Sequence, residues 1–131
     1  MPEEKRNEPN FILVPSSSPA EVVSLLLDRF PGMRDVVCPD EDSLAEPHRV
    51  YDSFASQVIK RIDDRVFTQS VGEFIDELAK SKEPLIGDVL VISLLEGIAV
   101  SPDAAKAMSN LIGEPARDLL QDVEKKMYGR G

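Results

Sequence analysis

The chain has 131 residues and a formal net charge of −9, because 24 acidic residues outnumber 15 basic ones. This length is typical of one domain, and 42% apolar residues with only 5% aromatic residues predict a mainly aliphatic core. The negative charge disfavours binding to nucleic acids and to anionic membranes and favours a basic partner.

The cysteine content and the lengths of the apolar runs indicate the cellular compartment of the protein. Cys38 is the single cysteine, so no internal disulfide and no cysteine-based zinc site are expected. No secretory signal is expected either, because Glu3 and Glu4 replace a basic n-region and the first apolar run is too short. The most apolar stretch, 85–100, falls short of the ~20 residues of a membrane span. We therefore expect a cytoplasmic protein.

Residues 1–18 are predicted to form a flexible N-terminal segment, because the first ten are mostly polar or charged. The apolar run Phe11–Val14 follows, and Pro15 favours an extended conformation before it. Two interpretations of this run stay open. It is either a strap on the protein's own core or a strand offered to the sheet edge of a partner.

A first helix is predicted to begin at Pro19. Ser18 is a favourable N-cap, and Glu21 completes a Ser-x-x-Glu capping box with it. The pair Pro31-Gly32 ends the helix. Its apolar residues recur at helical spacing: Val22, Val23, Leu26, Leu27 and Phe30.

Residues 31–47 are predicted to be a long irregular loop, and loops of this length in a small domain are often functional. The loop contains the acidic residues that we take as the candidate partner-binding site: Asp40, Glu41, Asp42 and Glu46. The spacing of Asp40 and Asp42 also suggests a calcium loop, but the glycine and the final glutamate of an EF-hand are absent. A solvated acidic loop is the preferred interpretation.

Two amphipathic helices are predicted next. The first runs from Pro47 to Ile62 with a regular apolar face, and the second covers the apolar residues between Val71 and Ala79. Thr68 or Ser70 is the expected cap of the second helix. Residues 63–67 are either a bend or a continuation.

Residues Leu85–Ala99 are apolar on nearly all sides, which is typical of a central helix covered by its neighbours. A hairpin with its turn at Gly87-Asp88 is the alternative. Its first arm would be very short, so the helix is favoured by length.

Two further helices complete the chain. Ser101 caps one that begins at Pro102, and Pro115 opens another that stops at Gly129. The prediction is therefore an all-α fold of about six helices in a single domain, residues 19–129. A compact bundle and a short HEAT-like stack of helix pairs both stay open, because no repeat of ~40 residues recurs convincingly.

The sequence offers no convincing catalytic, cofactor-binding or metal-binding motif. His48 is the only histidine, and the His-Glu-x-x-His zinc motif and the glycine-rich phosphate loops are absent. A nucleophilic site can be written from Cys38, His48 and Asp40, but no oxyanion signature accompanies it. We therefore expect a protein that is not an enzyme and has no cofactor. A small hydrolase using Cys38 and His48 is the less favoured alternative.

Four segments carry a resemblance to a family of small bacterial helical proteins of unknown function. They are residues 24–31 (SLLLDRFP), 50–54 (VYDSF), 74–79 (FIDELA) and 89–98 (VLVISLLEGI). In that group a helix ending in Phe-Pro precedes a helix pair, a helix with the pattern Ser-Leu/Phe-Leu-Glu and a final helix. The resemblance covers about residues 20–128 and implies an all-helical fold. Some similar proteins resemble the immunity proteins of bacterial toxin systems.

The leading prediction is therefore a non-catalytic, acidic protein-interaction module, with an immunity-type inhibitor of a basic partner as its narrower form. The alternative is a structural or scaffold protein that self-associates, for example as a homodimer. Its apolar contacts would come from Val36-Val37 and from Phe11–Val14.

Overall fold

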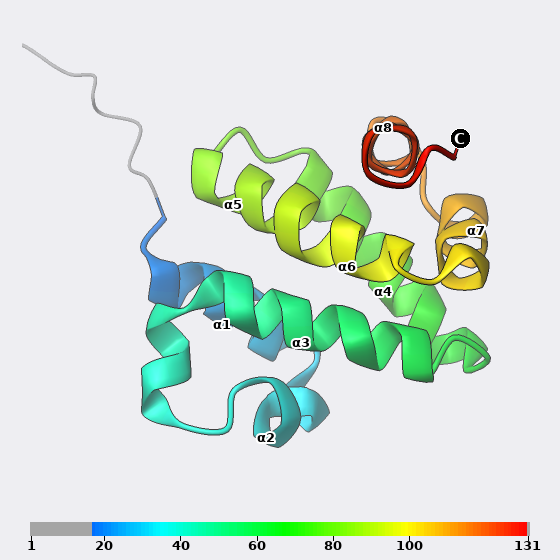
Figure 1. The fold of residues 1–131 in the computed structure, drawn as a ribbon. Helices are drawn as coiled ribbons and strands as arrows, with labels where there is room; N and C mark the ends of the chain where they lie inside the picture. The colour runs from blue at the N-terminus through cyan, green and yellow to red at the C-terminus, as the bar shows by residue number, and fades with distance from the viewer. Residues whose placement is uncertain (1–16, 131) are drawn as a thin grey trace, which may run out of the picture.

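Helices and the turns between them account for residues 17–130, the part of the chain that the computed structural model describes (Figure 1). The predicted all-α class is confirmed. The elements in chain order are α1 (Pro19–Arg29), η2 (Pro31–Met33), α2 (Arg34–Val37), η3 (Glu41–Ala45), α3 (Pro47–Lys60), α4 (Arg65–Ala79), α5 (Pro84–Asp88), η4 (Val89–Leu95), α6 (Glu96–Ala99), α7 (Pro102–Leu111) and α8 (Ala116–Tyr128).

The beginning of the described chain is held in place by hydrogen bonds. The backbone N–H of Ser17 donates to the Glu83 carboxylate, and the Ser17 hydroxyl lies 2.7 Å from the second carboxylate oxygen. Ser18 then caps α1 in the predicted capping box with Glu21. Residues 17 and 18 are therefore fixed, although they belong to the predicted flexible segment, and the rest of that segment lies outside the described residues.

The predicted loop 31–47 is largely helical, so that part of the prediction is wrong. It folds into the short elements η2, α2 and η3. Met33, Val37 and Cys38 turn inward and are at least 95% buried, and they attach these turns to the core. Single helical turns are too short to give a readable apolar period, which explains the error.

The start of α4 also differs from the prediction. Asp64 is the N-cap, and its carboxylate accepts from the backbone N–H of Phe67 at 3.1 Å. Thr68, a predicted cap, is buried inside the helix, and its hydroxyl bonds the carbonyl of Asp64. Residues 61–63 form the bend that precedes α4.

The elements α5, η4 and α6 follow one another without a break and form one continuous helical rod, Pro84–Ala99, which we call the central rod. The predicted central helix is confirmed, and the hairpin alternative at Gly87-Asp88 is wrong. The rod is not uniform, because η4 has the wider hydrogen-bonding pattern of a π-helix. It is also not fully covered, since the Ile92 side chain is 54% exposed.

The helices pack as a bundle in which the central rod lies between α3 and α8 (Figure 1). An aromatic cluster fills the space beside α3, with the ring centroids of Phe30 and Phe54 4.9 Å apart. Tyr51 is fully buried there, and its hydroxyl donates to the carbonyl of Val22 at 2.8 Å. Burial raises the pKa of Tyr51, so this hydroxyl stays protonated and keeps α3 bonded to α1.

None of the helices between residues 17 and 130 combines the length and the hydrophobicity that crossing a bilayer requires.

Candidate functional site

The four predicted partner-binding residues lie together on and beside η3. Asp40 is the N-cap of this short helix, and its Oδ1 atom accepts from the backbone N–H of Ser43 at 3.0 Å and from its hydroxyl at 2.9 Å. These hydrogen bonds hold the pKa of Asp40 below its usual value. Ser43 is 99% buried, so the exposed Asp40 carboxylate bonds the segment to a side chain in the interior.

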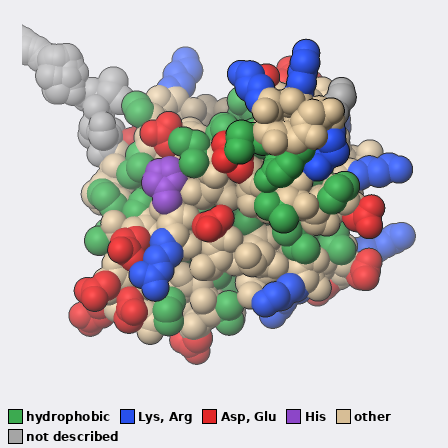
Figure 2. Space-filling model, viewed as in Figure 1, with side chains coloured by type: hydrophobic (Ala, Val, Ile, Leu, Met, Phe, Trp, Pro, Cys, Tyr) green, Lys and Arg blue, Asp and Glu red, His purple; other side chains and the backbone are tan. Residues whose placement is uncertain are grey.

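Glu41, Asp42 and Glu46 are exposed on the outside of the same segment. Glu46 accepts from the guanidinium of Arg49 at 2.8 Å, and this contact raises the pKa of Arg49. Exposed ion pairs of this kind contribute little to stability. Figure 2 shows that acidic side chains gather at its lower left, around η3, so this corner of the molecule is strongly negative. We call Asp40–Glu46 the acidic segment.

An open cavity of about 530 Å³ adjoins the acidic segment, between α3 and the central rod. Its lining residues are His48, Arg49, Asp52, Ile92 and Ser93. Because Arg49 lines the cavity and also pairs with Glu46, the two features form one continuous surface.

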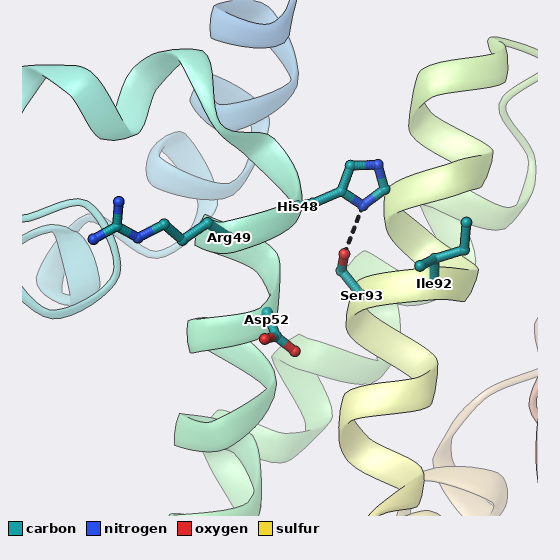
Figure 3. Close-up of a pocket in the computed structure, with 5 residues that line it drawn as sticks. All are labelled: His48, Arg49, Asp52, Ile92 and Ser93. Atoms are coloured by element: carbon teal, nitrogen blue, oxygen red, sulfur yellow. Dashed lines mark hydrogen bonds between the residues drawn. The ribbon is translucent and has the colours of Figure 1, made fainter. Parts of the chain in front are cut away.

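His48 and Ser93 form the polar wall of this cavity (Figure 3). The Nδ1 atom of His48 lies 2.7 Å from the Oγ atom of Ser93, which is 96% buried. Figure 3 shows the two side chains pointing toward each other across the gap between α3 and η4. Since Nδ1 is occupied, Nε2 is the ring atom left to bond another group.

Asp52 stands one helical turn after His48 on α3, and Figure 3 shows its carboxylate below Ser93. It lies close to Gly97, since a Cβ atom added to this glycine would be 3.5 Å from the Asp52 Oδ1 atom. That distance is an ordinary van der Waals contact, so the side chain that the Gly97 position excludes is excluded by Ala55 and not by the carboxylate. The cavity thus has a hydroxyl, an imidazole, a carboxylate and the apolar Ile92, which suits a ligand with both apolar and hydrogen-bonding groups.

The alternative nucleophilic site is not assembled by any hydrogen bond among the described residues. Cys38 is 95% buried, and its Sγ atom lies 3.8 Å from the carbonyl oxygen of Asp40. His48 bonds Ser93 instead. Among residues 17–130, no group of three or more His, Cys, Asp and Glu side chains could hold a metal ion.

A second cavity, of about 380 Å³, lies between α4 and α7. Its walls combine polar groups of Arg65, Gln69 and Asn110 with Leu111, which is 44% exposed. Neither cavity was predictable from the sequence, because each depends on how two helices far apart in the chain pack together. The π-helical stretch that carries Ser93 also has no sequence signature of its own.

Comparisons of the chain with protein-family models, with curated proteins and with solved structures found no match.

Proposed function

We propose that this protein is a non-catalytic module that binds a basic protein partner through the acidic segment. The observation that carries the proposal is the arrangement of Asp40, Glu41, Asp42 and Glu46 on one short element with a buried internal support. Because Ser43 anchors the segment, its charges are presented in a fixed geometry before a partner arrives. Preorganisation of this kind reduces the entropic cost of binding.

The electrostatics favour the same partner class. The chain carries a net charge of −9, and only Arg49 forms an ion pair with the acidic segment among the described residues. A field of this sign accelerates the approach of a basic surface and repels nucleic acids. The narrower form of the proposal is an immunity-type inhibitor that covers the basic surface of a toxin in the cytoplasm of a bacterium.

The test is affinity capture from a cell extract at low and at high salt, with two charge-matched variants. E41K/D42K reverses two exposed charges of the acidic segment whose carboxylates form no hydrogen bond or ion pair with another described residue. D63K/E73K reverses two exposed charges elsewhere and changes the net charge equally. We expect a basic protein that the wild type and D63K/E73K capture at low salt and that E41K/D42K loses. Equal capture by both variants would contradict the proposed surface.

Self-association as a scaffold is the second candidate, and exposed apolar side chains favour it. Val66 is 80% exposed and Val36 is 51% exposed, whereas Val37 is buried and is not available for a contact. Light scattering over a wide concentration range tests this candidate. A monomer at the highest concentration would remove it.

A further inference from the structure

The cavity between α3 and the central rod has an exposed apolar side chain at its edge. Ile92 is 54% exposed, while its neighbours Ser93 and Leu94 are at least 96% buried. A large aliphatic side chain in contact with water at a cavity of about 530 Å³ leaves apolar surface that another apolar group would cover favourably.

The described chain begins beside the same helical rod. Ser17 is attached to Glu83 by two hydrogen bonds, and Glu83 is the N-cap of α5. Ile92 follows Glu83 by nine residues, so it lies at most about 13 Å farther along the rod axis at a rise of ~1.5 Å per residue. Measured along the rod axis, the anchor of the N-terminal segment and the cavity are therefore at most about 13 Å apart.

The length of chain before Ser17 matches this separation. An extended chain covers at most about 3.3–3.6 Å per residue, so Val14 can lie up to about 10 Å and Phe11 up to about 20 Å from Ser17. Phe11–Val14 is the only run of four consecutive large apolar residues before the anchor. Its reach from Ser17, about 10–20 Å, includes the distance of about 13 Å between Glu83 and Ile92 along the rod axis. Pro15 favours an extended conformation for the residue before it, which suits this reach.

We propose that the cavity lined by His48, Ile92 and Ser93 is the docking site of this chain's own segment Phe11–Val14. The apolar side chains of the segment cover Ile92, and the free Nε2 atom of His48 bonds a backbone group of the segment. The anchor at Ser17 keeps the segment at a high effective concentration, so a small apolar contact is sufficient. The proposal does not depend on a partner for the acidic segment.

The experiment is NMR spectroscopy of the full chain, with the Ile92 methyl group and the His48 ring as reporters. F11S/L13S removes apolar side chains from the docking segment, and E4S/N10S is the matched control with two changes at polar positions of the same segment. Leu111 in the second cavity reports on effects elsewhere. The wild type is also recorded at several concentrations.

The proposal predicts nuclear Overhauser contacts between the Phe11 ring and the Ile92 methyl group. F11S/L13S shifts the Ile92 and His48 signals, whereas E4S/N10S leaves them in place and Leu111 does not move in either variant. Three results would overturn the proposal: no shift at Ile92, equal shifts with both double variants, or shifts confined to Leu111. Ile92 shifts that grow with concentration would also overturn it, because they would assign the contact to a second copy of the chain.

Discussion

Gly97 of α6 and Ala55 of α3 approach each other so closely that a Cβ atom added to Gly97 would lie 2.6 Å from the Cβ atom of Ala55. Both positions are helical, and Ala55 is fully buried. The same two elements, α3 and the central rod, also carry His48 and Ser93, which lie within hydrogen-bonding distance of each other.

Gly97→Ala is therefore expected to destabilise the protein by about 1–2 kcal/mol. Overpacking costs about 1–3 kcal/mol and exceeds the gain of up to ~1 kcal/mol in helix propensity. Urea unfolding measures the difference. Gly87→Ala is the control in the same rod, because nothing lies within 4 Å of an added Cβ atom there. It should stabilise the protein by about 0.5–1 kcal/mol. A Gly97→Ala variant that is stabilised as much as Gly87→Ala would contradict the close approach of Gly97 to Ala55.

A charged side chain at the centre of the rod is expected to destabilise the protein strongly. Leu94 is fully buried, so Leu94→Asp would place an unpaired carboxylate in the core. We expect the free energy of unfolding to fall by more than about 4 kcal/mol, which is a large fraction of the stability of a small domain. Ile92→Asp, two residues earlier and 54% exposed, should retain the helical circular dichroism of the wild type. A folded Leu94→Asp variant with an unchanged melting curve would contradict the central position of the rod.

The acidic segment is expected to lose its internal support in acid. The pKa of the Asp40 carboxyl is lowered by its bonds to Ser43, so the stabilising contribution is complete above the ordinary value of 3.8 and is lost as the pH falls through the lower folded-state value. The difference in unfolding free energy between the wild type and Asp40→Ala should therefore be constant near neutral pH and shrink below about pH 4. If this difference instead grew as the pH falls, the ionised Asp40 carboxylate would destabilise the folded protein, contrary to the prediction.

Cys38 is expected to react slowly with thiol reagents at neutral pH, because it is 95% buried. Labelling should accelerate when denaturant unfolds the domain. Rapid stoichiometric labelling of the native protein would instead support the hydrolase alternative, which needs an accessible thiolate. The count of labelled thiols is unambiguous, since Cys38 is the only cysteine.

The long helices could be predicted from the sequence because their apolar residues recur over several turns and their caps are local. Ser18 with Glu21, and Ser101 before Pro102, are examples in which the predicted hydrogen bonds are formed. The short helical turns in residues 31–47 could not be predicted in this way. Single turns are too short to show an apolar period, and they are stabilised by contacts with the core.

Only the part of the candidate site that is formed by residues close together in the sequence could be predicted. The carboxylates of the acidic segment are adjacent in sequence, and their exposure follows from their charge. The pairing of His48 with Ser93 joins residues 45 positions apart, at a contact of α3 with the central rod that includes the π-helical stretch and the close approach at Gly97. Neither feature has a residue pattern that marks it in one sequence.

The most direct test of the proposed function is the association rate with the captured partner, measured by stopped-flow at increasing ionic strength. For the wild type and D63K/E73K we predict a rate that falls steeply with salt, and for E41K/D42K a rate at least ~10-fold lower at low salt with a weaker salt dependence. The same rate and the same salt dependence for both double variants would contradict the assignment of binding to the acidic segment.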